Sequence, residues 1–275
     1  MIPLEDKFND ILGKARRGLG LSLGDLARQS GCEESQLQGW EAGHSVPEDS
    51  VLTRLAEALR LVPSRLLDSA HERWYPATPP ARMKSFLTIT SSFGDMLVNA
   101  YLVWDVSTRE AALFDTGTDF PAIRGPIESH PLRLKYLFLT HTHVDHVALL
   151  DEIRKAWKPE VVTSKGEFVP NATVAAEGRS FDLGRIRIKV FETEGHSPGG
   201  LTYAVQNLGE RLPQVAVVGD ALFAGSVGGP KFSYERLLGN LRKKILTLPD
   251  DTILAPGHGP LTTVGEEKKH NPFFS

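Results

Sequence analysis

One short segment of the sequence, Thr140–His146, places four metal-binding side chains within six consecutive positions. It contains three histidines and one aspartate, whose imidazole nitrogens and carboxylate oxygens are ligands for zinc, iron and manganese. The apolar residues 136–139 that precede it are typical of a buried strand, and apolar, helix-compatible residues follow it up to Trp157. We therefore expect the four ligands to converge on a turn between a strand and a helix.

Three more ligand-type side chains lie further along the chain, each directly after a strand-like run. Gly or Pro flanks each of them and allows the backbone to turn tightly. They are His196 after residues 186–191, Asp220 after residues 215–218 and His258 after residues 253–255. Because the same context recurs each time, we expect these side chains to belong to the same site as the first four.

The order of these residues resembles that of the metallo-β-lactamase superfamily, in which His-x-His-x-Asp-His is followed by a separate His, Asp and His. Gly219–Ser226 resembles the aspartate motif of its glyoxalase-II-like branch, the hydroxyacylglutathione hydrolases. Residues 257–263 and 271–273 resemble the C-terminal part of its small members. The resemblance covers the chain from Phe86 onward and implies an α/β fold, an αβ/βα sandwich of two sheets that are each faced by helices.

The resemblance also implies a site for two divalent ions, built from histidine and aspartate alone. It assigns His141, His143 and His196 to the first ion, Asp145, His146 and His258 to the second, Asp220 to a bridge between them, and Asp115 to support of the metal-binding loop. The only cysteine, Cys32, lies far from these motifs. Zinc is the expected ion, with iron and manganese as alternatives, because these ligands discriminate poorly among the three.

The implied chemistry is hydrolysis of a small-molecule ester or thioester. Two cations about 3.5–4 Å apart lower the pKa of a bridging water, and the resulting hydroxide attacks a carbonyl carbon that one metal polarises. Asp145 is the candidate catalytic residue, because it could accept a proton in addition to its role as a ligand.

The substrate is less well specified by the sequence. Lys165, Lys231 and Tyr234 are candidate contacts for an anionic substrate. The arginine that follows the aspartate motif in glyoxalase II is missing from Ser226–Lys231, so the resemblance supports thioester or ester hydrolysis better than it supports glutathione as the carrier.

The N-terminal part of the chain has a different pattern. Apolar residues recur at helical spacing through residues 1–72, with Gly and Pro between the segments. The pattern resembles a Cro/C1-type helix-turn-helix domain, with Ser22–Ser30 as the first helix of the motif and Glu33–Ala42 as the recognition helix. We expect a small all-α bundle at 1–72, a Pro-rich linker at 73–82 and the catalytic domain at 83–275.

The charge of this helical domain makes DNA an unlikely partner. Residues 1–70 contain eight Lys and Arg residues against eleven Asp and Glu residues, whereas DNA binding depends on neutralising phosphates. Glu33 and Glu34 stand at the start of the recognition helix, and the one basic cluster of the domain, Lys14, Arg16 and Arg17, lies outside that helix. We expect weak or no DNA binding and a role in packing, in shielding the active site or in a homodimer.

Three alternative functions remain open at this stage. A persulfide dioxygenase of the same superfamily uses one iron held by two His and one Asp. A metabolite-responsive DNA-binding regulator would explain the helical domain. A nuclease or phosphodiesterase is disfavoured, because residues 71–275 contain 23 basic and 23 acidic residues and therefore have no net positive charge.

The location of the protein is predicted from what the sequence contains. Residues 1–6 are not the apolar core of a signal peptide, one cysteine allows no internal disulfide, and no apolar run approaches the length of a membrane span. We expect a cytoplasmic protein without a membrane segment.

Overall fold

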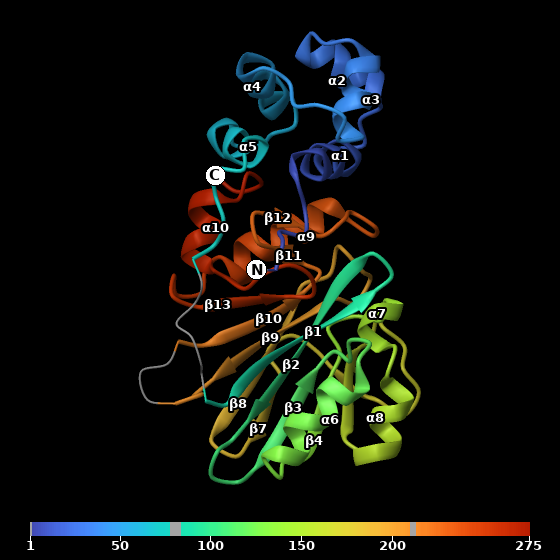
Figure 1. The fold of residues 1–275 in the computed structure, drawn as a ribbon, viewed down its shortest axis with the longest axis vertical. Helices are drawn as coiled ribbons and strands as arrows, with labels where there is room; N and C mark the ends of the chain where they lie inside the picture. The colour runs from blue at the N-terminus through green and yellow to red at the C-terminus, as the bar shows by residue number, and fades with distance from the viewer. Residues whose placement is uncertain (1, 78–83, 210–212) are drawn as a thin grey trace.

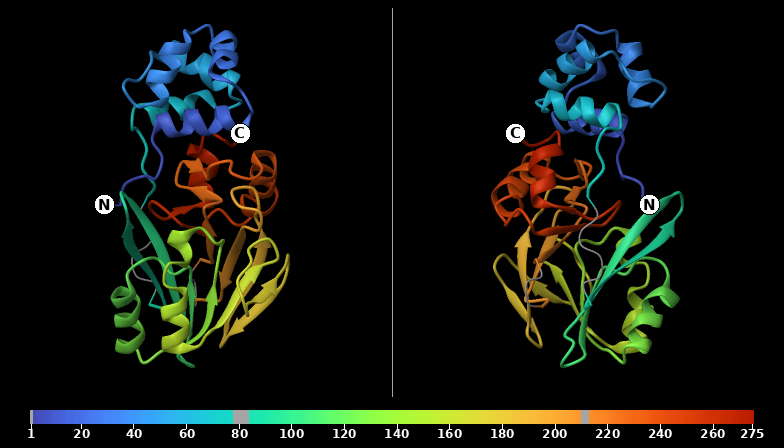
Figure 2. Two further views of the ribbon diagram at one scale, coloured as in Figure 1. Left: turned by 90° about the vertical axis from the view of Figure 1, so that its right-hand side faces the viewer. Right: turned by 60° about the vertical axis from the view of Figure 1, so that its left-hand side comes forward.

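The computed structural model describes residues 2–77, 84–209 and 213–275, and shows a helical bundle stacked on one end of a two-sheet sandwich (Figure 1, Figure 2). The bundle consists of α1 (Phe8–Gly18), α2 (Leu23–Ser30), α3 (Glu34–Glu41), α4 (Asp49–Ala58) and α5 (Pro63–Ala70). None of the helices in the described part of the chain is long and apolar enough to cross a lipid bilayer.

Local signals fix the helix-turn-helix pair. Ser22 precedes α2, its hydroxyl accepts a hydrogen bond from the Asp25 amide at 3.0 Å, and the Asp25 carboxylate accepts one from the Ser22 amide. The helix ends at Gly31, whose φ of 67° is a left-handed conformation that glycine adopts without strain. The predicted helices at 22–30 and 33–42 are therefore confirmed to within one residue at each end.

Two six-stranded sheets form the sandwich. The first has the order β1 (Phe86–Phe93), β2 (Met96–Trp104), β3 (Glu110–Phe114), β4 (Arg133–Phe138), β5 (Glu160–Ser164) and β6 (Thr173–Ala175). The second has the order β14 (Thr262–Thr263), β13 (Ile253–Pro256), β10 (Val215–Gly219), β9 (Leu201–Gln206), β8 (Ile186–Glu192) and β7 (Ser180–Leu183). A small hairpin joins β11 (Leu222–Phe223) to β12 (Ser226–Val227).

The sheets pack on each other through an apolar core that contains a cluster of aromatic rings. Phe114, Phe138 and Tyr203 are buried there, with ring centroids between 4.9 and 5.6 Å apart. On the outer face of the first sheet lie α6 (Phe120–Ser129) and α8 (Leu150–Trp157); on that of the second lie α9 (Tyr234–Asn240), a π-helical continuation (Leu241–Ile245) and α10 (Val264–His270). This layering confirms the expected αβ/βα sandwich.

The structure corrects some of the expected elements. The single helix expected after the first motif, up to Trp157, is two helices, α7 (Val144–Val147) and α8, because the chain turns at residues 148–149. Helix α9 changes to π geometry at Leu241. Helix α6 was not expected, because it contains Pro121 and Pro126, and proline is unfavourable inside a helix.

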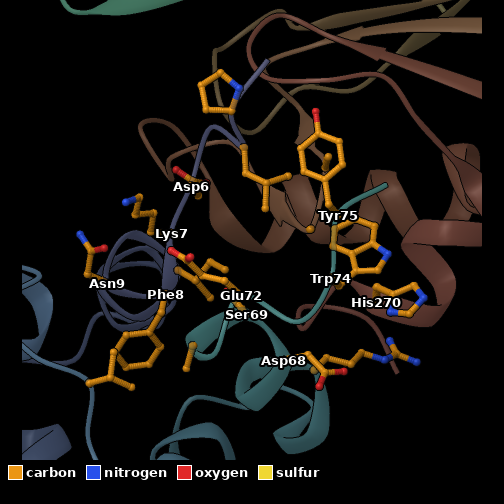
Figure 3. Close-up of a pocket in the computed structure, with 18 of the residues that line it drawn as sticks. Asp6, Lys7, Phe8, Asn9, Asp68, Ser69, Glu72, Trp74, Tyr75 and His270 are labelled. Atoms are coloured by element: carbon orange, nitrogen blue, oxygen red, sulfur yellow. The ribbon is translucent and has the colours of Figure 1, made fainter. Parts of the chain in front are cut away.

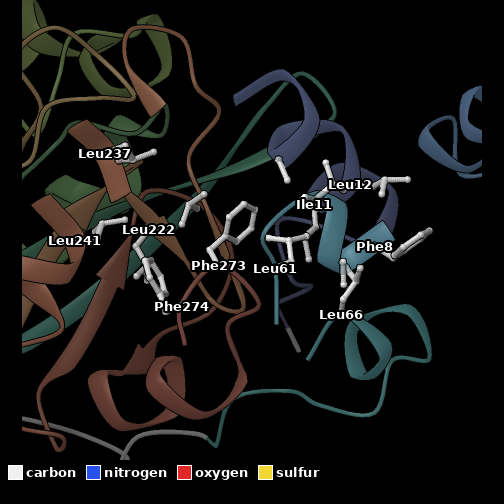
Figure 4. Packing of buried hydrophobic residues seen from close by; sticks show 14 of the residues in the cluster. Phe8, Ile11, Leu12, Leu61, Leu66, Leu222, Leu237, Leu241, Phe273 and Phe274 are labelled. Atoms are coloured by element: carbon white, nitrogen blue, oxygen red, sulfur yellow. The ribbon is translucent and has the colours of Figure 1, made fainter. Parts of the chain in front are cut away.

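The bundle docks on the sandwich through α1 and α5. One continuous apolar cluster includes Phe8 and Leu66 of the bundle together with Leu222, Phe273 and Phe274 (Figure 4). The amide of Val62 donates to the Pro272 carbonyl at 2.8 Å. The packing role expected for this domain therefore has a defined interface.

The part of the expected linker that the structure describes also packs on the sandwich. The Trp74 indole donates to Glu266 at 2.9 Å, and its ring stacks on His270 with centroids 5.0 Å apart. Residues 78–82 of the expected linker lie outside the described residues.

Candidate metal centre

The predicted ligands come together at one edge of the sandwich, where the loops after four strands meet. His141 and His143 follow β4, His196 follows β8, and Asp220 follows β10. His143 Nδ1 lies 2.8 Å from His141 Nε2 and 3.1 Å from His196 Nε2, and Asp220 Oδ2 lies 3.7 and 3.5 Å from the same two Nε2 atoms. These four residues have the ligand types and the mutual distances of one metal site.

A second group of ligand-type atoms lies on the other side of Asp220. His258 Nε2 is 3.2 Å from Asp145 Oδ2, and His146 Nε2 is 3.4 Å from the same oxygen. Asp220 Oδ1 lies 3.3 Å from His146, while Asp220 Oδ2 lies 3.5 Å from His258. One carboxylate therefore contacts both groups, as a residue that bridges two ions would.

Hydrogen bonds outside the two groups orient the imidazole rings. His146 Nδ1 donates to Asp115 at 2.8 Å, His258 Nδ1 donates to the Leu97 carbonyl at 2.7 Å, and His196 Nδ1 donates to the Gly229 carbonyl at 3.0 Å. Because a carboxylate or carbonyl oxygen accepts, each Nδ1 carries a proton, and Nε2 is the nitrogen of each ring that is directed inward to bind a cation.

Burial and charge shift the pKa values of these groups in opposite directions. Burial lowers the pKa of His196 to about 4 and holds that of His141 well below its ordinary value. Burial also opposes the charge on His146 and His258, but neighbouring carboxylates outweigh it and raise their pKa values to about 10 and about 11. The pKa of Asp220 is held well below its ordinary range, because several histidines outweigh its burial.

Two buried ligand-type atoms indicate that a cation fits this site. His146 Nε2 and Asp220 Oδ1 face each other at 3.3 Å, yet neither has a hydrogen-bond partner within residues 2–77, 84–209 and 213–275. Buried polar atoms without partners are costly, and a divalent ion is a partner that both could share. The residues present therefore fit a metal.

Two carboxylates hold the loop that carries the first ligands. Asp115 accepts from the Thr140 amide at 2.7 Å and from its hydroxyl at 2.8 Å, besides His146, which is the supporting position expected for it. Glu167, which no sequence pattern indicated, accepts from the amide and hydroxyl of Thr142 and from the Gly199 amide. No local motif surrounds Glu167, so only the fold reveals its position.

The three candidate substrate contacts have different surroundings. Lys231 is exposed, and its charge contributes to lowering the pKa values of His143 and His196, so it lies beside the first group. Lys165 is exposed in the loop after β5. The expectation for Tyr234 is corrected, because its ring packs against Gly18 and Phe273 and therefore faces the helical bundle.

Comparison with known proteins agrees with this arrangement. The sequence pattern of the metallo-beta-lactamase superfamily matches residues 93–258, and that of a helix-turn-helix domain matches residues 11–69. Hydroxyacylglutathione hydrolase GloC of Haemophilus influenzae is 31% identical over 202 residues, which are 64% of this chain and 92% of that protein.

Two solved structures are similar over the sandwich. ETHE1 from Myxococcus xanthus is 26% identical, with a TM-score of 0.59 over 68% of this chain and 83% of that one. TTHA1623, solved in a di-iron-bound form, is 28% identical, with a TM-score of 0.55 over 67% of this chain and 99% of that one. The chain therefore belongs to the metallo-β-lactamase superfamily and carries a helix-turn-helix domain before its catalytic fold.

Proposed function

We propose that the protein is a dinuclear metal-dependent hydrolase that cleaves a small-molecule thioester or ester. The observation that carries the proposal is the position of Asp220, whose two oxygens face the two groups of ligand-type atoms. The similarity to a hydroxyacylglutathione hydrolase favours a thioester, and the protein solved with two irons favours a site for two ions.

Each candidate site residue has a role in the proposed reaction. His141, His143 and His196 would hold one ion, Asp145, His146 and His258 the other, and Asp220 both. Two divalent ions held there would supply Lewis-acid chemistry, which activates water and polarises a carbonyl. Asp145 is also the carboxylate placed to accept a proton, and Lys231 presents a cation on the side of His143 and His196 to an anionic part of the substrate.

Exposed apolar side chains next to the metal-binding loops favour a substrate with an apolar part. Val144, inside the first motif, is 66% exposed, and Phe168, beside Glu167, is 86% exposed. Phe232 follows Lys231 and is 48% exposed, while its amide donates to the Gly195 carbonyl next to His196. Such side chains at the entrance of a site gain free energy when they bury an acyl group.

Metal content is the first test. Protein purified without chelators is expected to contain two divalent ions per chain, zinc before iron or manganese, and to lose hydrolysis when a chelator removes them. Elemental analysis measures the ions, and turnover is measured on hydroxyacyl thioesters, simple esters, lactones and phosphodiesters. Turnover of phosphodiesters alone would replace the thioester assignment.

The similarity to ETHE1 of Myxococcus xanthus favours one second candidate, an iron-dependent persulfide dioxygenase. The same metal analysis separates the two. One iron per chain, no second site on titration and oxygen uptake with a persulfide would establish the dioxygenase instead.

We further infer that the helix-turn-helix domain binds DNA weakly or not at all. Arg16 pairs with Glu41 at 2.5 and 2.8 Å, and Lys14 pairs with Asp6, so two members of the basic cluster are already neutralised. The exposed start of α3 carries Glu33 and Glu34, where phosphates would approach.

Selection of bound fragments from genomic DNA, followed by titration at physiological salt, is expected to yield no specific site, because too few free cations face the phosphates. A control titration at low salt separates weak non-specific binding from none. Recovery of specific sites with nanomolar affinity would contradict the inference and support the metabolite-responsive regulator.

A further inference from the structure

The segment Ile2–Lys7, which precedes α1, extends from the helical bundle to the loop that carries His258. A Cβ placed on Gly259 would lie 3.1 Å from the Glu5 amide nitrogen and 3.6 Å from the Pro3 carbonyl oxygen. The backbone of the segment therefore lies against the residue next to His258. We call it the N-terminal strap.

Polar contacts fix the strap at both ends. The Tyr75 hydroxyl donates to the Ile2 carbonyl at 2.6 Å. Lys14 on α1 pairs with Asp6 at 2.5 Å, donates to the Val227 carbonyl at 3.0 Å and lies over the ring of Phe223, 4.8 Å from its centroid. The Phe223 ring in turn meets the His258 ring edge-on at 5.8 Å. The strap is thus connected to the metal centre through side chains on both domains.

A cavity of about 550 Å³ lies between the two domains, on the side of the strap away from Gly259. Asp6, Lys7 and Phe8 line it from the strap and α1, and Trp74 and Tyr75 line it from the chain that leaves α5 (Figure 3). Because the cavity leaves this side of the strap without close packing, the strap is held by its polar contacts and by its packing on Gly259.

The strap brings the side chain of Glu5 to the His258 side of the site, because the Glu5 Cβ would lie 3.5 Å from a Cβ placed on Gly259. Burial raises the pKa of Glu5 to about 7, while the positive charge on His258 acts in the opposite direction. Bound cations would favour the ionised carboxylate further. The positive charge of Lys231 acts on the opposite side, where it contributes to lowering the pKa values of His143 and His196, so a carboxyl group and a cation flank the site.

We propose that the N-terminal strap is a wall of the active site and that Glu5 is a specificity-determining residue, which disfavours anionic groups beside His258 and favours neutral or cationic ones. The proposal rests on the proposed metal-dependent function and narrows its substrate class. The reacting molecule would present its uncharged or cationic part to the strap, so a carrier with a carboxylate at that position is excluded.

Thiols that bind the metals directly provide a test that does not require turnover. The probes are mercaptoacetate, 2-mercaptoethanol and cysteamine, which are anionic, neutral and cationic, and calorimetry on the metal-loaded full chain measures each Kd. Each variant is compared with the wild type, so that differences in acidity among the thiols cancel.

Glu5→Gln is expected to change the ratio of Kd values for mercaptoacetate and cysteamine by about tenfold in favour of mercaptoacetate binding, and Glu5→Lys is expected to change it further in the same direction. An unchanged ratio in Glu5→Lys would overturn the proposal.

Glu57→Gln is the matched control, because Glu57 is an exposed glutamate on α4, and its ratio is expected to equal that of the wild type. A shift as large in Glu57→Gln as in Glu5→Gln would show a general charge effect and would also overturn the proposal. Failure of every thioester and ester to react would contradict the proposed hydrolase function, whereas the thiol ratios would still report on Glu5.

A second variant tests the strap without changing its charge. Tyr75→Phe removes the hydroxyl that holds Ile2 and is expected to speed cleavage after Glu5 by a glutamate-specific protease and to weaken the discrimination among thiols. Tyr136→Phe removes a hydroxyl from the core between the sheets and should change neither measurement. Faster cleavage with unchanged discrimination would show that the strap is not a wall of the site.

Discussion

Asp220→Ala is expected to reduce hydrolysis by several orders of magnitude and to lower the metal content of the purified protein. The side chain lies within 3.7 Å of ligand nitrogens on four histidines from both groups. Among the residues that the structure describes, it is the one carboxylate that contacts both groups, so its removal takes away the side chain that would fix the distance between the ions. Loss of a shared ligand therefore affects two sites, whereas loss of one histidine affects one.

The experiment compares turnover and metal content in Asp220→Ala, Asp220→Asn and Asp151→Ala. Asp220→Asn keeps the size of the side chain and removes its charge, so it separates a steric effect from the loss of the anion. Asp151 is an exposed aspartate on α8, and its replacement should leave both quantities unchanged. Near-normal turnover with two ions bound in Asp220→Ala would show that the bridge is assigned to the wrong residue.

Gly257→Ala is expected to have the second-largest effect, although it adds only one methyl group. A Cβ at this position would lie 2.2 Å from Asp220 Oδ1 and 2.6 Å from His146 Cε1. Both neighbours are held by further contacts, so the methyl group displaces the carboxylate or the imidazole. A displacement of about 1 Å in a catalytic site can cost about 100-fold in rate, and we expect at least that loss of kcat/KM.

Metal titration of the same variant should show weaker binding, most of all of the ion held by the second group, because His146 belongs to that group and Asp220 contacts both groups. Gly125→Ala is the control, since Gly125 lies on α6 and a Cβ there would meet no atom of the described residues within 4 Å. A Gly257→Ala protein with wild-type kcat/KM and metal affinity would refute this explanation of why glycine occupies the position.

The candidate ligands could be predicted from the sequence because each is marked locally. The first four are grouped directly after an apolar run, the other three each follow an apolar run beside Gly, and the side-chain types alone define the chemistry. The helix-turn-helix pair was predictable for the same reason, since Ser22, Asp25 and Gly31 act within one or two helical turns.

Residues that act across the fold could not be predicted in this way. Glu167 supports the first motif from a loop 25 positions away in the sequence, and nothing near it in the chain marks that role. Tyr234 was expected to contact an anionic substrate, but its ring packs against Gly18 of the docked bundle. The position of the strap could not be predicted either, because the contact between Glu5 and Gly259 depends on how the bundle docks on the sandwich.

The apolar cluster that joins the bundle to the sandwich also determines when each part of the protein can be completed. During synthesis the ribosome produces Phe8 and Leu66 long before Phe273 and Phe274, yet these side chains share one buried cluster. The bundle therefore leaves the ribosome early with part of its apolar surface in water, and it must wait for nearly the whole sandwich before that surface is covered. Contacts this distant in sequence form late and slowly, so the nascent bundle is the part of the chain most in need of protection from aggregation while translation continues.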